Sequence, residues 1–290
     1  MAKSIVALIT PFTSDNKINF EELNKICEFH LESKTDCLLL LGTTAEAESL
    51  NDEEKYKVVE SVYNKVYPKI KIMVGLISNI TEEVIKLSKL FNEFEIESFL
   101  VINPYYIKTN DSGMLKHFTY IADNVSKPII IYNVPKRTGQ NISFDVVKFL
   151  SYHKNIIGIK EASGDINYLI KISTLIKDDF NLYCGDDSLM LVSLFLGSKG
   201  IINVIGNAFP KEIKLLIETY NKDIKLSKFI YYKYLSLMSV LYDEVSPIGI
   251  KYVMYLLGFD TNKYRMPLDE PSKIFKRKLE NELLYIVDTD

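Results

Sequence analysis

Short apolar runs of strand length recur along most of the chain, and this repeat constrains the fold more than any other feature. Each run is rich in Ile, Val and Leu and shows little alternation with polar residues. The eight runs cover residues 4–10, 37–41, 70–75, 98–102, 128–132, 156–160, 181–184 and 200–203. Runs of this kind are typical of parallel strands that are buried on both faces of a sheet.

Helical patterns separate these runs. Residues 19–34 place Leu23, Ile26 and His30 on one face, and Asn51 with Glu54 three residues later has the spacing of a capping box. Strand and helix alternating eight times predict an α/β fold, a (β/α)8 TIM barrel. A doubly wound open sheet is the alternative, but the turn after the first run, residues 8–20, has no glycine.

The residues after the eighth run exceed what a barrel needs. Helical patterns cover residues 211–220, 226–241, 247–257 and 272–287, whereas a barrel requires one helix after its last strand. We therefore expect a catalytic barrel over residues 1–222 and a C-terminal helical appendage over residues 223–290 that packs on it.

Composition excludes several classes of function. The formal net charge is −3 and no Lys/Arg run stands out, so we expect no nucleic-acid partner. Cys27, Cys37 and Cys184 are isolated, which predicts neither a disulfide framework nor structural zinc. The apolar stretch before Pro11 is too short for a signal peptide or a membrane span, so we expect a cytoplasmic protein without a membrane partner.

Polar and reactive residues follow the apolar runs. In barrels of this class the carboxyl ends of the strands meet at one mouth, which carries the active site. The residues at these ends are Thr43, Thr44, Tyr105, Tyr106, Tyr132, Asn133, Lys160, Glu161, Gly185, Asp186, Asp187 and Asn203. We expect them to converge although they are far apart in the sequence.

Lys160 is the most informative of these residues. A lysine at a strand end is usually solvent-exposed, but this one ends a central barrel strand. It would serve either as a cation for an anionic substrate or as a nucleophile that forms a Schiff base with a carbonyl. Imine formation also needs a proton shuttle, and Tyr132, Tyr106 and Thr43 are the candidate hydroxyl groups.

Each candidate also has an ordinary structural explanation. The chain has 19 tyrosines, most of which we expect to pack in the core with a hydrated hydroxyl. Thr43 and Thr44 would simply cap the next helix, and Arg137 would be a solvated loop charge. In the functional interpretation Arg137 is a bidentate clamp for a carboxylate.

The sequence gives little support for a metal site or a phosphate site. His30, His117 and His153 fall in separate helical segments, so no histidine cluster forms at the barrel mouth and no metal is expected. Asp186 and Asp187 follow the seventh run, where a barrel phosphate site would lie, and would repel phosphate. The substrate is expected to be a non-phosphorylated acid, and the two aspartates are expected to cap the next helix.

Four motifs in this order give a family resemblance: "GTTAE", "NPYY", "YNVPKRTG" and "GIKEASGD". With these motifs the chain resembles the pyruvate-dependent class I aldolases, and within them most closely the dihydrodipicolinate synthase family. The likeness extends from "IVALITPF" to "SPIGIKYVMYLLG". It implies condensation of pyruvate with aspartate semialdehyde at the entry to lysine and diaminopimelate biosynthesis.

The resemblance implies a role for each matching residue. Lys160 would form the Schiff base with pyruvate, and Tyr132 would be the proton shuttle. Thr43 would complete the relay together with Tyr106, which would reach across a dimer interface. The residues implied to bind substrate are Thr44, Gly185 and Ile202 for the pyruvate adduct and Arg137 for the carboxylate of the semialdehyde. The family further implies a homotetramer built as a dimer of dimers, without a cofactor.

Three departures from the family pattern concern the second substrate. Ala45 replaces a usual glycine, Asn103 replaces a threonine and Ile107 replaces an asparagine. The alternatives therefore stay open that the aldehyde is a sugar, as in an N-acetylneuraminate lyase or a 2-keto-3-deoxy sugar acid aldolase, or that the barrel binds a keto acid without turnover.

Feedback inhibition by lysine is a further property of many relatives. Asn79, Glu83 and Tyr105 match the inhibitory site at the dimer interface. Glu48, Asp52 and Lys55 stand where lysine-sensitive bacterial members often carry a small residue and histidines. These three positions weigh against lysine inhibition.

Overall fold

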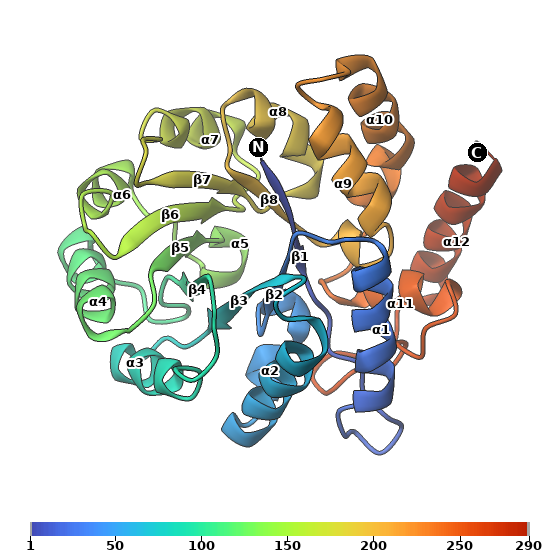
Figure 1. Cartoon of the computed structure of the whole chain (residues 1–290), viewed down its shortest axis with the longest axis horizontal. Helices are drawn as coiled ribbons and strands as arrows, with labels where there is room; N and C mark the ends of the chain where they lie inside the picture. Colours follow the sequence, from blue (N-terminus) through green and yellow to red (C-terminus); the bar gives the residue numbers. More distant parts are fainter. Residues whose placement is uncertain (1, 289–290) are drawn as a thin grey trace.

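The chain folds into a closed barrel of parallel strands, as Figure 1 shows for the computed structural model, which describes residues 2–288. The strands follow one another in sequence order, and β1 pairs with β8 to close the barrel. They are β1 (Lys3–Ala7), β2 (Cys37–Leu40), β3 (Lys71–Leu76), β4 (Ser98–Ile102), β5 (Ile129–Asn133), β6 (Ile156–Glu161), β7 (Asn181–Cys184) and β8 (Gly200–Asn203). The TIM-barrel prediction is confirmed, and the open sheet is excluded.

Helices surround the barrel and follow the strands. They are α1 (Phe20–Glu32), α2 (Asp52–Val66), α3 (Thr81–Lys89), α4 (Asp111–Asn124), α5 (Pro135–Thr138), α6 (Phe144–Leu150), α7 (Ile166–Ser173), α8 (Met190–Phe195), α9 (Pro210–Thr219), α10 (Ile224–Val240), α11 (Ile248–Leu256) and α12 (Lys273–Asp288). Short 3-10 turns lie at η1 (Thr43–Ala45), η2 (Ala47–Ser49), η3 (Asp187–Leu189) and η4 (Ile205–Asn207).

Local sequence explains where these elements begin. Every residue of β2, β4 and β5 is buried, as expected for strands covered on both faces. Helix α2 begins after Asn51, whose side chain accepts from the Glu54 backbone N–H while the Glu54 carboxylate accepts from the Asn51 backbone N–H. The predicted capping box is therefore confirmed.

Two buried asparagines, one at the end of β8 and one in the turn η4 after it, hold the last strand against the first. Asn203 donates through Nδ2 to the carbonyl oxygen of Ile5 at 3.2 Å. Asn207 donates to the Ala7 carbonyl at 2.8 Å and accepts from the Ile9 backbone N–H at 3.1 Å. Side-chain amides thus satisfy backbone groups at the closing seam of the barrel.

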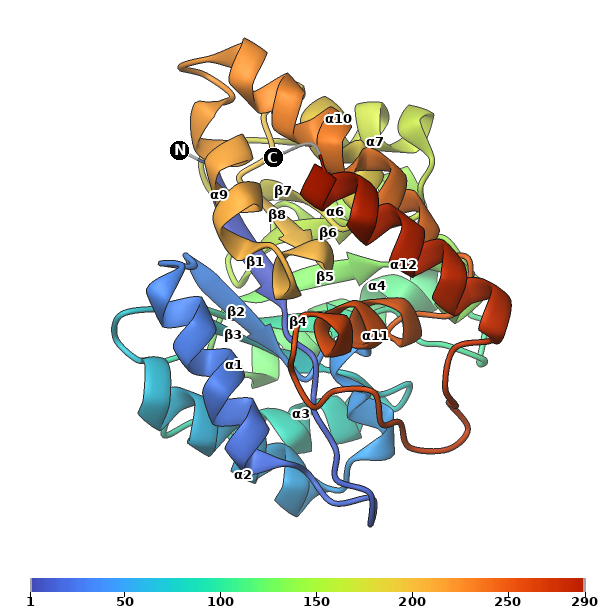
Figure 2. The same ribbon diagram turned by 90° about the vertical axis from the view of Figure 1, so that its right-hand side faces the viewer.

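The C-terminal helices form a layer beside the barrel. Helix α12 packs on α10 and α11, and Figure 2 shows it between the two. Helix α9 ends at Thr219 and α10 begins at Ile224, with Asp223 as its N-cap. The predicted division at residues 222/223 falls in the turn between these helices. None of the helices described here is long and apolar enough to cross a membrane.

Candidate active site

Lys160 and Tyr132 lie side by side at the carboxyl end of the barrel. They are register partners on β6 and β5, and each side chain is 6% exposed. The Lys160 Nζ lies 4.4 Å from the centroid of the Tyr132 ring. Within residues 2–288, no hydrogen bond or ion pair engages this amine. A buried primary amine without a salt-bridge partner, next to a phenol, is suited to reaction with a carbonyl.

Gly185 allows Lys160 to take this position. A Cβ atom at Gly185 would lie 2.6 Å from the Lys160 Cε and 2.7 Å from the Ala162 Cβ. The Gly185 backbone N–H donates to the Glu161 carbonyl at 2.7 Å, which fixes β7 against β6. A side chain at residue 185 would therefore displace the lysine. Ile202 is buried in the neighbouring strand β8.

Glu161 points to the other face of β6, as alternation along a strand requires. Its carboxylate accepts from the Asn133 Nδ2 at 2.6 Å and from the Ser163 backbone N–H at 2.6 Å. Burial raises the pKa of Glu161, and these hydrogen bonds oppose the shift. Asn133 also accepts from the Ile142 backbone N–H at 3.0 Å. This network anchors the ends of β5 and β6 behind Lys160 and Tyr132.

Asp186 and Asp187 differ in what they bind. Asp186 accepts from the Ser188 backbone N–H at 3.0 Å and caps η3, as expected. Asp187 is fully buried and instead accepts from the backbone N–H groups of Val204 and Ile205, the latter at 2.8 Å. Burial raises the pKa of Asp187 to about 7, against the effect of these donors. The expectation that Asp187 caps the next helix was wrong, because its carboxylate joins the β7 end to the β8 end.

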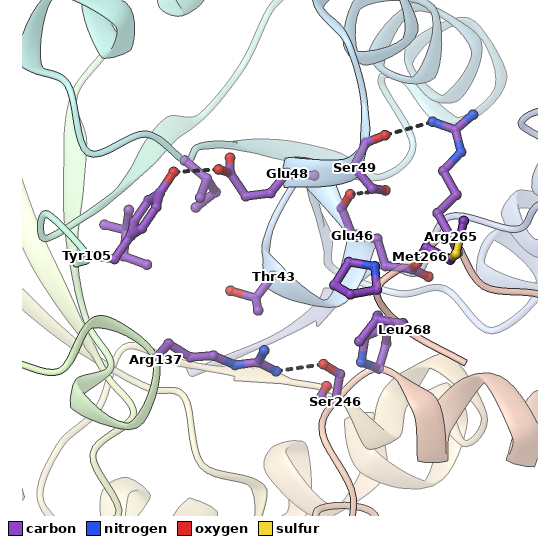
Figure 3. Close-up of a pocket in the computed structure, with 15 residues that line it drawn as sticks. Thr43, Glu46, Glu48, Ser49, Tyr105, Arg137, Ser246, Arg265, Met266 and Leu268 are labelled. Carbon is purple, nitrogen blue, oxygen red and sulfur yellow. Dashed lines mark hydrogen bonds between the residues drawn. The ribbon is translucent and has the colours of Figure 1, made fainter. Parts of the chain in front are cut away.

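A cavity of about 330 Å³ opens beside the barrel mouth (Figure 3). Its lining residues include Thr43, Ile77, Ile102, Tyr105 and Arg137 from the barrel and Ser246, Pro247, Arg265, Met266, Pro267 and Leu268 from the C-terminal region. The helical appendage therefore forms one wall of the cavity instead of merely packing on the barrel.

The register of the strands relates this cavity to the reactive lysine. Ile102 on β4 lines the cavity and is the register partner of Tyr132 on β5, which pairs with Lys160 on β6. Adjacent strands lie about 4.8 Å apart, so the cavity lies one strand from Tyr132 and two from Lys160. Of the predicted site residues, Thr43, Tyr105 and Arg137 line this cavity. The other predicted site residues do not line it, namely Lys160, Tyr132, Thr44, Tyr106, Gly185, Ile202, Asn79 and Glu83.

Thr43 and Thr44 belong to the 3-10 turn η1, directly after β2. Thr43 is half-buried at the cavity and Thr44 is buried. Neither threonine caps this turn, since the residue before it is Gly42. The Thr43 carbonyl accepts from the Glu46 backbone N–H at 3.1 Å.

Arg137 reaches from the barrel to the C-terminal region. It lies in α5, which begins with Pro135 and ends at a left-handed Gly139. The Arg137 Nη2 donates to the Ser246 carbonyl at 2.6 Å, as Figure 3 shows. The guanidinium is exposed at the cavity, with further donors available for a carboxylate.

Tyr105 and Tyr106 point in different directions. Tyr105 is half-buried and its hydroxyl donates to the Glu48 carboxylate. Tyr106 has φ +65°, which is unusual for a residue with a side chain, and it is 92% exposed. The turn also joins the Ile107 backbone N–H to the Tyr105 carbonyl at 2.7 Å. Tyr106 is thus held out from the barrel surface by a strained turn.

Of the residues whose sequence matches an inhibitory site, Asn79 binds this turn and Glu83 lies on α3. Asn79 donates through Nδ2 to the Tyr105 carbonyl at 3.3 Å. Glu83 is exposed and forms an ion pair with Lys86 at 3.3 Å. The Tyr105 hydroxyl is already bound to Glu48.

Histidines do not gather at the barrel mouth. His30 and His117 are buried in α1 and α4, where burial lowers the pKa to about 3 and about 4, respectively. His153 lies in the turn after α6 and not in a helix, contrary to expectation. Within residues 2–288, no group of three or more His, Cys, Asp or Glu side chains is arranged to hold a metal ion.

Sequence reasoning missed three charged residues near the cavity: Glu46, Lys251 and Arg265. Glu46 and Lys251 form a buried ion pair at 2.6 Å. Arg265 lines the cavity and binds Glu54 through Nη2 at 2.6 Å. The available signal was the single lysine within the apolar stretch "IGIKYVMYLL", since a lysine is almost never fully buried without a partner.

Comparisons with known proteins agree with this geometry. A curated 4-hydroxy-tetrahydrodipicolinate synthase from Clostridium tetani is 38% identical over 285 residues, covering 96% of this chain and 97% of the relative. The dihydrodipicolinate synthase of Acinetobacter baumannii in complex with pyruvate superposes with a TM-score of 0.95 at 31% identity, covering 99% of both chains. The enzyme from Cyanidioschyzon merolae with lysine bound gives a TM-score of 0.92 at 29% identity, covering 99% of this chain and 98% of that one.

The family match spans nearly the whole chain. Residues 1–285 match the Dihydrodipicolinate synthetase family, in agreement with the resemblance carried by the four motifs. Together with the barrel and the placement of Lys160, this shows that the chain belongs to the dihydrodipicolinate synthetase family.

Proposed function

We propose that this chain is a 4-hydroxy-tetrahydrodipicolinate synthase that condenses pyruvate with L-aspartate semialdehyde in lysine and diaminopimelate biosynthesis. The observation that carries the proposal is the buried Lys160 amine, which forms no ion pair within residues 2–288 and lies 4.4 Å from the Tyr132 ring in a chain of this family. A relative with that name matches 96% of the chain.

Lys160 supplies the nucleophile. Its neutral amine attacks the C2 carbonyl of pyruvate, and the carbinolamine loses water to give an imine. Loss of a methyl proton converts the imine to an enamine, whose carbon attacks the aldehyde of the semialdehyde. The amino group of the semialdehyde then attacks the imine carbon. This attack closes the ring as an aminal. Transfer of a proton to the Lys160 nitrogen then lets the C–N bond to Lys160 break, which leaves the cyclic imine and the free Lys160 amine.

These steps need a group that moves protons. Tyr132 is the shuttle, because its ring lies against the Lys160 amine. Thr43 lines the cavity and passes protons between Tyr132 and that cavity. Tyr106 completes the relay in the neighbouring subunit, and its 92% exposed side chain supports this role.

Binding roles follow from position at the mouth. Thr44, buried in the turn after β2, holds the pyruvate carboxylate. Gly185 and Ile202 present backbone groups to the adduct from β7 and β8. Arg137 binds the carboxylate of the semialdehyde, since its guanidinium faces the cavity and the Ser246 carbonyl positions it.

The three departures from the family pattern do not favour a sugar aldehyde. Asn103 is fully buried and donates to the Thr138 hydroxyl and to the Gln140 carbonyl, both at 3.1 Å. Ala45 fits within a 3-10 turn with its methyl group buried. Ile107 is exposed and lies outside the cavity. The Arg137 clamp therefore favours the semialdehyde over the sugar acids.

The subunit is proposed to act in the cytoplasm as a homotetramer built as a dimer of dimers. One set of exposed apolar residues consists of Ile80 before α3 and Tyr106 and Ile107 after β4. A second set consists of Ile166, Ile170, Phe195, Phe229 and Tyr232 on α7, α8 and α10. Figure 1 draws α8 between α7 and α10, away from α3. Two separate apolar surfaces support two kinds of subunit contact.

Lysine is proposed to be a weak inhibitor at most. Tyr105 would have to release Glu48 before its hydroxyl could contact a ligand. Glu48 also adds a carboxylate at the place where Asn79 and Tyr105 meet.

Pyruvate consumption tests the proposal. The purified chain is incubated with pyruvate, with and without aspartate semialdehyde, and products are identified by NMR. Consumption only with the semialdehyde, with formation of the cyclic product, is expected. Failure to consume pyruvate would exclude the synthase, and consumption with N-acetylmannosamine or a sugar aldehyde instead would support the alternative aldolases.

A further inference from the structure

Lys251 is a buried cation with no role in the reaction described above. It lies in α11, within an otherwise apolar helix. Its Nζ binds the Glu46 Oε1 at 2.6 Å, and the side chains of Lys251 and Glu46 are 0% and 2% exposed. An ion pair removed from water to this degree is weak evidence for added stability, because desolvation offsets the attraction.

Groups around this pair hold both charges in place. The Lys251 Nζ lies 4.5 Å from the centroid of the Phe12 ring and 4.8 Å from that of Tyr264. The second carboxylate oxygen of Glu46 accepts from the Arg265 backbone N–H at 3.3 Å. Both oxygens of Glu46 are therefore bound by the C-terminal region.

The backbone of Glu46 connects this pair to the threonine turn. Glu46 has φ +55° and ψ +36° and stands between η1 and η2. Its N–H donates to the Thr43 carbonyl at 3.1 Å. A non-glycine residue in the left-handed region persists only where the surroundings enforce it, and such strain clusters at functional sites. Here the buried side chain supplies that constraint.

We propose that Glu46 is a positioning residue, which Lys251 holds so that the Thr43 hydroxyl keeps its orientation in the proton relay. The C-terminal helix α11 thereby sets the geometry of the barrel mouth. This inference rests on the proposed synthase activity, and Glu46 acts through the turn, since its side chain is 2% exposed and bound by Lys251 and Arg265.

The chain offers a matched control, an ion pair at the opposite end of β2, the strand that precedes Thr43 and Glu46. Asp36 immediately precedes β2 and binds the Lys214 Nζ at 2.7 Å, and its other oxygen accepts from the Ser4 backbone N–H at 3.0 Å. Asp36→Asn removes an ion pair without touching the mouth. It is expected to lower the melting temperature while kcat stays within about twofold of the wild type.

Two variants test the positioning role. Glu46→Gln breaks the ion pair, and the double variant Glu46→Gln/Lys251→Met removes both charges, so that no buried charge is left unpaired. We expect kcat to fall about tenfold or more in each, because the relay is misplaced. The KM for aspartate semialdehyde, which Arg137 binds, is expected to change less than about twofold.

A double-mutant cycle that combines Glu46→Gln with Thr43→Val separates a positioning role from a general loss of structure. If Glu46 acts through Thr43, Glu46→Gln lowers kcat less than about twofold in the Thr43→Val background. Equal losses in both backgrounds would overturn the proposal, and so would a double variant with wild-type kcat. A wild-type protein that makes no product would instead overturn the proposed function, and the positioning role with it.

Discussion

The Tyr132 ring and the Lys160 amine are register partners on β5 and β6, and 4.4 Å separates the amine from the ring centroid. Register between adjacent strands places a phenol beside a buried amine without any help from loops. Because both residues belong to rigid strands, their geometry is set before substrate arrives.

Removing the amine is expected to abolish imine chemistry. Lys160→Ala should give no covalent pyruvate adduct on borohydride reduction, measured by intact-protein mass spectrometry, because it removes the buried amine that lies 4.4 Å from the Tyr132 ring. Lys199→Ala is the control, since Lys199 is exposed at the other end of the barrel, just before β8. Undiminished trapping in Lys160→Ala would show that the Schiff base forms elsewhere.

A methyl group at residue 185 is expected to disturb Lys160. Gly185→Ala would place a Cβ 2.6 Å from the Lys160 Cε, so the lysine must move. We expect kcat to fall by about tenfold to a hundredfold, because small misplacements of a reacting group are costly. Gly42→Ala is the control, since its Cβ would meet only the Leu39 side chain at an ordinary 3.5 Å. Similar kinetics for both variants would show that the contact does not position the lysine.

Arg137 is expected to act on one substrate only. Arg137→Ala should raise the KM for aspartate semialdehyde by about tenfold or more, because a charge-assisted carboxylate clamp is lost. The KM for pyruvate should change less than about twofold. Lys136→Ala is the matched control, an exposed cation in the same short helix. Equal increases in KM for both substrates would show that Arg137 does not act on the semialdehyde alone.

The buried histidines predict acid sensitivity. Burial lowers the pKa of His30 to about 3 and that of His117 to about 4, whereas an unfolded histidine titrates near 6.5. The unfolded chain therefore binds more protons as the pH falls below 6.5, and stability present above that pH is lost. From pH 7 to pH 5, each histidine should lower the free energy of unfolding by roughly 2 kcal/mol.

Urea unfolding at several pH values measures this loss. His30→Gln can keep a hydrogen bond to Thr35, which the wild-type ring contacts at 2.9 Å, but cannot titrate. In this variant the free energy of unfolding should therefore decrease by roughly 2 kcal/mol less between pH 7 and pH 5 than in the wild type. An unchanged decrease in the variant would show that His30 does not carry the linkage.

The apolar surface on α7, α8 and α10 is expected to bury in the tetramer. Phe195 is its most exposed member, and Phe195→Asp would place a charge in that contact. We expect sedimentation to show dimers in place of tetramers, with Lys160 trapping retained, because the group around Tyr106 lies elsewhere. Phe149→Asp is the control, an exposed aromatic residue on α6. Tetramers that persist in Phe195→Asp would place the interface on another surface.

Local patterns in the sequence were enough to predict the barrel and the place of Lys160 at the end of a buried strand. Unbroken Ile, Val and Leu runs indicated strands covered on both faces, and the position of Lys160 at the end of such a run indicated the mouth. The adjacent positions of Lys160 and Tyr132 followed because strand ends in a parallel barrel converge whatever the loops contain. Motif resemblance added the roles that spacing alone left open.

Tertiary structure decided what the charged residues bind. Glu46 and Lys251 are 205 positions apart, and no periodicity in the sequence connects them. The sequence predicted Asp187 as a helix cap, but its buried carboxylate instead binds a backbone N–H group directly after β8. Strand and helix signals depend on neighbours within a few residues, whereas the partner of a buried charge is chosen by desolvation and distance in the folded chain. Only the packed structure brings those partners together.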